Sequence, residues 1–282
     1  MPLQEGARCG EIQRDTPMSI PSYEVFAIKY AERDGRRPDH FLGGDPHDAP
    51  MPLDYYVWLV RSGERTVLVD TGFDAGMAAK RNRRLLRAPH EALRLLGVAA
   101  ADIRTAIVTH LHNDHVGTFH DFRNATFHLQ DREMSHVTGR SMRQRLLRRP
   151  YEIDHVAGMV QLVYRDRVAF HDGDAEIAPG ISVHLIGGHT AGMQSVRVHT
   201  RRGWVVLASD ASHLYEHFEN GGVFPVTYNP AEVLEGYRKL KELADSPRHI
   251  VPGHDPLVLQ RYPAAGPGLD GIAVELHAEP AR

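Results

Sequence analysis

The chain has 282 residues, 42% of them hydrophobic, so it is long enough to bury a sizeable core as one large domain or two small ones. Its 33 basic and 36 acidic residues give a formal net charge of −3, which argues against a nucleic-acid-binding protein, because such proteins usually carry a basic balance. No apolar stretch reaches the roughly 18 residues of a membrane helix, and the single cysteine, Cys9, excludes an internal disulfide and favours a cytoplasmic protein.

In chain order, a polar, proline-containing stretch comes first, and residues 1–20 are expected to form an extended arm. Short apolar, β-branched runs follow, each bounded by glycine, proline, aspartate or asparagine, which is typical of strands. These runs cover residues 23–30, 55–60, 66–70, 105–109, 125–129, 181–186, 195–200, 204–209 and 249–251. Most sequential strands look hairpin-connected, so we expect one α/β or α+β domain over residues 1–282, with much antiparallel pairing.

Two helices are expected between these strands. Residues 89–97 begin with a proline at a first helical position and end at a glycine. Residues 229–244 open with Asn229 as a cap, and Glu235 and Lys239 have the spacing of an ion pair on one helix face.

The most informative segment is VTHLHNDHVG at 108–117, which holds three histidines and an aspartate within six positions after an apolar run. In an extended segment His110 and His112 point the same way, because side-chain direction repeats every two residues. Asp114 and His115 follow where the chain turns. Imidazole and carboxylate groups together are ligands for a divalent metal such as zinc. Two ligand pairs from one loop indicate two adjacent metals more naturally than one.

Three further candidate ligands follow other apolar strands, each close to a glycine or another small residue. HLIGGHTAGMQS contains His189, WVVLASDAS contains Asp210, and HIVPGHDP contains His254. Each residue alone could be an ordinary loop histidine or a capping aspartate. Together they supply the additional ligands that two metal ions need.

The seven candidate ligands, in this order and spacing, resemble the ligand set of the metallo-β-lactamase superfamily of dinuclear metallohydrolases. They are His110, His112, Asp114, His115, His189, Asp210 and His254. LVDTG at 68–72 is similar to an early strand and turn of that superfamily. The resemblance covers about residues 55–260 and implies a four-layer αββα sandwich with both metals at one edge of two packed sheets.

The resemblance also implies a role for each ligand. The first two histidines of the motif and His189 would bind one metal. Asp114, His115 and His254 would bind the other, with Asp210 and a hydroxide bridging the two ions. Asp70 would be a buried carboxylate behind the ligands, although a simple turn-capping role is equally compatible with DTG. Zinc is the first choice of metal, and iron, cobalt and manganese are alternatives.

Within the superfamily, the later motifs resemble those of the N-acyl-homoserine lactonases. GGHTAGMQS at 187–195 is similar to their Gly-His-Ser-Pro-Gly-His-Gln-Ser, and SDASHLYEHFEN at 209–220 to their Asp-Ala-Ser-Tyr-x-x-x-x-Phe. This resemblance implies a quorum-quenching type of hydrolase, able to form a homodimer, in which the hydroxide opens the ester bond of a small-molecule lactone. A thioesterase, or another hydrolase of cyclic esters or amides, is the alternative enzyme. An inactive metal-dependent sensor is the alternative from another class.

The chain departs from the lactonase pattern at several positions. His213 stands where the lactonases commonly have a tyrosine that holds the lactone carbonyl, so His213 could donate that hydrogen bond, or Tyr215 could take over.

Asp114 is the candidate acid that would protonate the leaving alkoxide. Met193 replaces a common histidine. The interval from His115 to His189 is longer than is usual in the lactonases. Within it, about residues 131–165 are expected to form a helical cap that shapes a different pocket.

Two arginine-rich runs remain, KRNRRLLR at 80–87 and RSMRQRLLRR at 140–149. They could attract an anionic substrate or a coenzyme A group. More often such runs are solvated helix faces whose aliphatic stems cover apolar surface.

Overall fold

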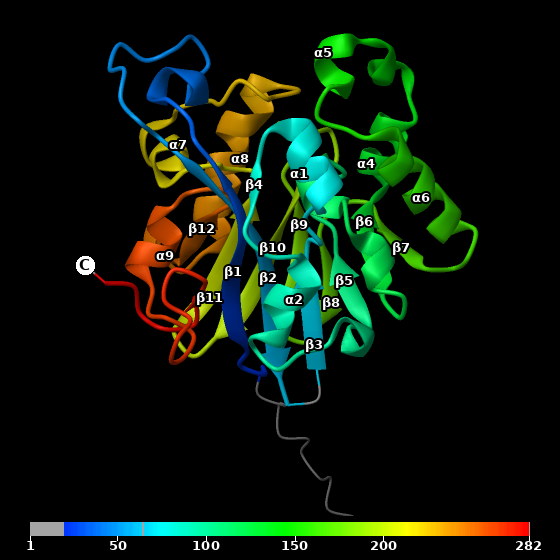
Figure 1. Cartoon of the computed structure of the whole chain (residues 1–282), viewed down its shortest axis with the longest axis vertical. Helices are drawn as coiled ribbons and strands as arrows, with labels where there is room; N and C mark the ends of the chain where they lie inside the picture. The colour runs from blue at the N-terminus through cyan, green and yellow to red at the C-terminus, as the bar shows by residue number, and fades with distance from the viewer. Residues whose placement is uncertain (1–19, 64, 282) are drawn as a thin grey trace, which may run out of the picture.

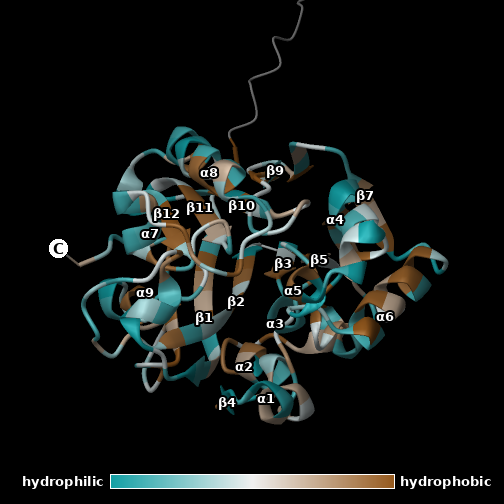
Figure 2. Ribbon diagram, turned by 90° about the horizontal axis from the view of Figure 1, so that it is seen from above, coloured by the Kyte–Doolittle hydropathy of each residue, from teal (hydrophilic) through white to brown (hydrophobic). Residues whose placement is uncertain are grey.

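Two β-sheets pack face to face and helices cover their outer faces in the computed structural model, which describes residues 20–63 and 65–281 (Figure 1). Viewed from above, the layers follow in the order helix, sheet, sheet, helix, with α8 on one side and α1 and α2 on the other (Figure 2). The expected αββα sandwich is therefore confirmed. Cys9 and nearly all of the expected arm lie outside the described residues.

The first sheet has eight strands and is antiparallel in one half and parallel in the other. Its order is β13 (Ala273–Glu275), β1 (Glu24–Arg33), β2 (Leu53–Ser62), β3 (Arg65–Val69), β5 (Thr105–Ile107), β6 (Thr126–Gln130) and β7 (Val168–His171), with β4 (Arg84–Leu85) paired to β1. Strands β1 to β3 are antiparallel, whereas β3, β5, β6 and β7 run parallel. The expected hairpins are thus wrong for the second half, where helical crossovers return the chain to the same end.

The second sheet has five strands. Its order is β12 (Ile250–Pro252), β11 (Gly203–Ser209), β10 (Gln194–Thr200), β9 (Ile181–Leu185) and β8 (Ala175–Ala178). Only β11 and β12 are parallel neighbours. Because β9, β11 and β12 all point in one direction, their carboxyl ends lie at the same edge of the sandwich.

The helices are mostly short. In the described residues they are α1 (Ala75–Arg81), α2 (Pro89–Arg94), α3 (Asn113–Val116), α4 (Asp131–Val137), α5 (Arg145–Arg148), α6 (Ile153–Val163), α7 (Tyr215–Asn220), α8 (Pro230–Leu243) and α9 (Leu257–Arg261), with one 3₁₀ helix before α1 and four between the α-helices. The segment 131–165, expected as a helical cap, holds α4, α5 and α6 between β6 and β7. None of the described helices is long and apolar enough to cross a membrane.

Helix α8 begins as expected, but its ion pairs differ from the expected one. The Asn229 side chain accepts hydrogen bonds from the backbone N–H groups of residues 231 and 232 and caps the helix. Lys239 does not pair with Glu235. Its Nζ lies 2.6 Å from Asp174 Oδ1, just before β8, while Glu235 pairs with Arg238. Because α8 packs against the second sheet, Lys239 pairs with Asp174 of another element and not with Glu235 on its own helix.

Alternating side chains divide the core into two layers. On β1, Val25 and Ala27 face the space between the sheets, whereas Phe26 and Ile28 face the helices outside the first sheet. Residues 205–208 of β11 are buried on both faces, because the first sheet covers one side and α8 the other. The rigid strands therefore deliver the loops at their carboxyl ends to one fixed edge.

Candidate metal centre

The seven candidate ligands come together at one edge of the sandwich, in the loops that follow β5, β9, β11 and β12. The motif loop after β5 carries the first four, and α3 begins inside it. Six of the seven are buried to 4% exposure or less, and only Asp114 is partly exposed. Segments far apart in the sequence thus place several titratable side chains in one water-poor space.

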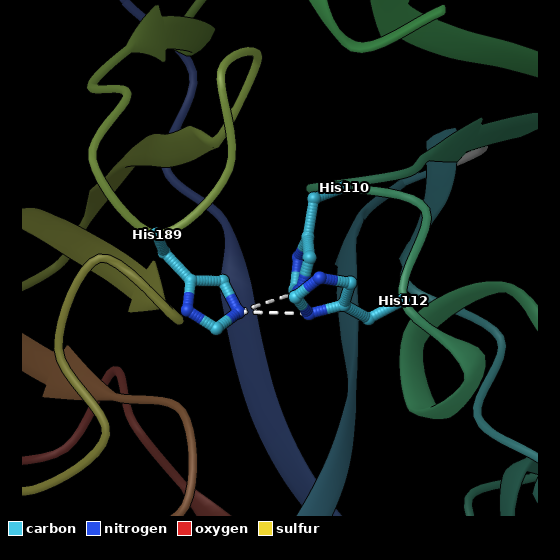
Figure 3. A group of neighbouring side chains, drawn as sticks. All are labelled: His110, His112 and His189. Carbon is cyan, nitrogen blue, oxygen red and sulfur yellow. Dashed lines mark hydrogen bonds between the residues drawn. The ribbon is translucent and has the colours of Figure 1, made fainter. Parts of the chain in front are cut away.

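His110, His112 and His189 form the first group (Figure 3). His189 Nε2 lies 3.2 Å from His110 Nε2 and 2.9 Å from His112 Nδ1. Three ring nitrogens from two loops therefore point at a common position.

Asp114, His115 and His254 form the second group, and Asp210 lies between the two groups. Asp210 Oδ1 lies 3.4 Å from His115 Nε2 and 3.0 Å from His254 Nε2. Asp210 Oδ2 lies 3.2 Å from His189 Nε2, on the side of the first group. Oδ2 also lies 3.2 Å from His254 Nε2, so this one carboxylate contacts both groups.

The outer nitrogens of three of these histidines have partners outside the cluster, which turns their inner nitrogens towards it. His115 Nδ1 lies 2.8 Å from Asp70 Oδ2, His189 Nδ1 lies 2.7 Å from the Val226 carbonyl, and His254 Nδ1 lies 2.8 Å from the Asp54 carbonyl. His115 Nε2 and Asp210 Oδ1 are buried without a hydrogen-bond partner. Orphaned inner atoms with oriented outer ones are what a bound cation requires, so this donor set fits divalent metal.

The electrostatics of the cluster agree with that fit. Burial, reinforced by neighbouring imidazoles, holds the pKa of His110 and His112 well below the usual value. Burial also lowers the pKa of His115, but Asp210 and Asp70 outweigh it and raise that pKa well above the usual value. Burial raises the pKa of Asp210, but His254 and His115 outweigh it and hold it well below its usual range. Protons on His115 would compete with a metal, so metal affinity falls as the pH falls.

Asp70 is the buried carboxylate behind the second group. Besides His115, it accepts hydrogen bonds from the Thr109 backbone N–H and hydroxyl, both at 2.8 Å. Its φ of 60° is a strained value for a residue other than glycine. The carboxylate thus fixes the ring orientation of a ligand and the start of the motif loop together.

His213 lies at the cluster, and Tyr215 does not. His213 Nε2 lies 3.1 Å from Asp210 Oδ2 without a hydrogen bond of good geometry, and its ring stacks on Phe224 at 3.8 Å between centroids. The Tyr215 ring instead packs against the guanidinium of Arg261, at 3.7 Å. Tyr215 is the first residue of α7, and its side chain packs towards α9, so this structure does not bring it to the cluster.

Glu133 on α4 was missed by the sequence reasoning. It is fully buried, and its Oε1 accepts the N–H of Leu111 at 2.9 Å, between two of the ligands. Its Oε2 accepts the Thr190 hydroxyl at 2.6 Å and the Gly192 N–H at 3.1 Å, in the loop of His189. A Cβ at residue 192 would lie 2.2 Å from the Glu133 nitrogen, so the glycine is required there. An acidic residue in the first turn of a helix is common, so nothing in the sequence marks this one.

A cavity of about 140 Å³ adjoins the cluster. His112 and His189 line its inner end. Leu146, Leu147 and Tyr151 of the segment 131–165 form one wall, and the loop 225–228 forms the other. A small apolar group can therefore lie directly beside the first group of histidines.

The sequence from residue 51 to residue 254 matches the family described as the metallo-beta-lactamase superfamily. This stretch is well over half of the chain and contains all seven candidate ligands. The chain therefore belongs to the metallo-beta-lactamase superfamily.

The proteins similar to this chain include lactonases and a probable metallo-hydrolase. The N-acyl homoserine lactonase AiiA of Bacillus thuringiensis subsp. kurstaki is 27% identical over 223 residues, which cover 73% of this chain and 82% of that protein. A probable metallo-hydrolase of Mycobacterium tuberculosis is 28% identical over 249 residues, covering 78% and 77%. A quorum-quenching N-acyl homoserine lactone lactonase has the same fold, with a TM-score of 0.71 at 24% identity over 84% of this chain and 94% of that one. These likenesses support a metallo-hydrolase of the lactonase type.

We predict that Asp70→Asn weakens metal binding by about 10- to 100-fold, as the loss of a carboxylate behind a histidine ligand typically does. The amide cannot accept from His115 and both Thr109 donors at once. Competition with a chromophoric chelator measures the affinity. Asp74→Asn, which changes an exposed cap of α1, is the matched control and should retain wild-type affinity. Equal affinities in both variants would contradict the role of Asp70.

Proposed function

We propose that this chain is a dinuclear metal-dependent lactonase that opens the ester bond of a small-molecule lactone. The position of Asp210 is the main support, because one buried carboxylate faces two separate groups of histidines. A single tetrahedral ion would not use both groups, whereas two adjacent ions would share such a carboxylate. The likeness to N-acyl homoserine lactonases adds support for the lactone as substrate.

In this proposal the first group of histidines holds one ion and Asp114, His115 and His254 hold the other, with Asp210 between them. Zinc suits the imidazole and carboxylate donors, and iron, cobalt and manganese suit them too. When bound, such a pair of ions lowers the pKa of water and polarises an ester carbonyl. The protein's own contribution is to fix the ligands, exclude water from the inner side and move protons.

Asp114 is suited to proton transfer, because it is the most exposed of the seven side chains. Its side chain is 19% exposed, and its Oδ2 lies 3.9 Å from both His115 Nε2 and His254 Nε2. A carboxylate in that position can carry a proton from the nucleophile to the leaving alkoxide.

We therefore predict that Asp114→Asn lowers kcat by about 10²- to 10⁴-fold, the usual range for the loss of a general acid–base group, with a much smaller effect on KM. Steady-state kinetics on protein of measured metal content tests this. An unchanged kcat at full metal occupancy would exclude Asp114 from proton transfer.

His213 is suited to hold the carbonyl oxygen. Burial keeps its pKa well below the usual value despite Asp210, so the ring is neutral and carries one N–H. Stacking on Phe224 fixes the ring beside Asp210. A fixed N–H donor in a buried site stabilises a developing oxyanion more than it would in water.

We predict that His213→Phe, which keeps a flat ring without a donor, lowers kcat by about 10- to 1,000-fold. His213→Gln, which keeps an N–H donor, should recover part of that loss. Both variants need metal analysis, because His213 also lies beside Asp210. A His213→Phe protein with full metal content and wild-type kcat would assign His213 a packing role only.

The proposed function itself is tested by a pH-indicator assay on a panel of short- and long-chain lactones, N-acyl homoserine lactones and acyl-thioesters. We expect ring opening that is lost after chelation and returns with about two divalent ions per chain, as the two groups of ligands require. Faster cleavage of thioesters than of lactones would favour a thioesterase. Metal binding without turnover of any member would overturn the enzyme assignment.

A further inference from the structure

The two arginine-rich runs are used in different ways. In the run 80–87, Arg81 pairs with Glu152 and donates to the Arg149 carbonyl at 2.8 Å. Arg84 pairs with Glu32, and Arg87 donates to a backbone carbonyl. This run therefore stabilises the fold, as an ordinary surface run does.

The run 140–149 has no such partners. Its five arginines are exposed, and the run contains no acidic residue. They are Arg140, Arg143, Arg145, Arg148 and Arg149. Within residues 20–63 and 65–281, no carboxylate lies within 4.0 Å of any of these guanidinium groups, and no side-chain hydrogen bond involves them. The run therefore presents five positive charges within ten residues, with no negative charge among them.

The end of this basic run is tied to the loop that carries the first four candidate ligands. The Asn113 side chain, next to Asp114, donates to the Pro150 carbonyl at 2.8 Å, and Arg81 fixes the adjacent backbone. In the view from above α5 lies near α3 (Figure 2), and in the side view it stands at the same end of the molecule as α1 (Figure 1). Arg149 lines the same cavity as His112 and His189.

The cavity thus joins an apolar interior to a basic rim. Leu147 and Val226 line it, and Leu146 lies at its edge with 78% exposure. Acidic side chains occur on the other side, where Asp131, Asp172 and Glu232 line an adjoining groove with Arg140. An anion is therefore expected at the Arg149 end of the run.

We propose that Arg149, which lines the cavity, binds an anionic group of the substrate together with Arg145 and Arg148 of the adjacent helix α5. The ester opened at the metal cluster would then carry a carboxylate or phosphate at the end away from the scissile carbonyl, with a short apolar part in the cavity. Guanidinium groups suit both anions, because they can donate two parallel hydrogen bonds to paired oxygens. Unpaired positive charge at the mouth also raises the rate at which anions arrive. This inference rests on the proposed lactonase function.

The test compares γ-lactones with side chains of equal length that end in a carboxylate, a phosphate or a neutral carboxamide. For the metal-loaded protein we expect kcat/KM to be about tenfold higher for an anionic lactone than for the carboxamide, mainly through KM, since charge-assisted hydrogen bonds are the stronger kind. The preference should shrink as ionic strength rises. The better of the two anionic lactones identifies the anion.

The triple variant Arg145→Gln/Arg148→Gln/Arg149→Gln should lose this preference. Arg94→Gln on α2, which removes an exposed positive charge far along the chain from this run, is the matched control and should keep it. Equal kcat/KM for charged and neutral lactones in the wild type, or the same ratio in the triple variant, would overturn the inference.

Tetrahydrofuran analogues with the same side chains separate this inference from the proposed function, because they have no ester to cleave. Calorimetry should show about tenfold tighter binding of the carboxylate analogue than of the carboxamide, lost in the triple variant. That result without turnover of any lactone would support the anion site and overturn the lactonase. Lactone turnover without any charge preference would overturn the anion site alone.

Discussion

The burial of one carboxylate among imidazoles is the constraint on which this molecule depends. Asp210 lies against ligands of both groups, and at 3% exposure it is almost entirely shielded from bulk water. A buried charge of this kind is tolerated only when it is paired or bound to metal. The carboxyl ends of parallel strands position the histidines that pair with this carboxylate. The strand arrangement of the sandwich therefore determines the geometry of the cluster.

The candidate ligands could be selected from the sequence because each one closely follows an apolar strand. His110 and His112 lie two positions apart after a buried strand, so strand geometry alone turns both rings to the same side. His189, Asp210 and His254 follow three other strands, whose geometry likewise fixes where these residues emerge. Most strands could be placed for the same reason. The parallel half of the first sheet was not predicted, because direction depends on how the crossovers pack and not on the strand residues themselves.

Residues whose role depends on tertiary neighbours could not be assigned. Tyr215 faces Arg261 because of the way α7 packs, and Lys239 prefers Asp174 on another element to its helical neighbour. Nothing in the sequence distinguishes Glu133 from other acidic residues, yet it accepts donors from two of the four ligand loops. The two arginine runs have similar composition. Only the neighbouring residues in the fold show that the run 80–87 forms ion pairs and hydrogen bonds whereas, among the described residues, the run 140–149 does not.

Glu133 has a wider consequence. It anchors the base of the segment 131–165 to the ligand loops after β5 and β9, whereas the five arginines of the run 140–149 have no ion pair or side-chain hydrogen bond among the described residues. The rim can therefore change residue by residue during evolution without disturbing the metal ligands. A lineage with this architecture can acquire new substrates by altering one short surface stretch while its reactive centre stays constant.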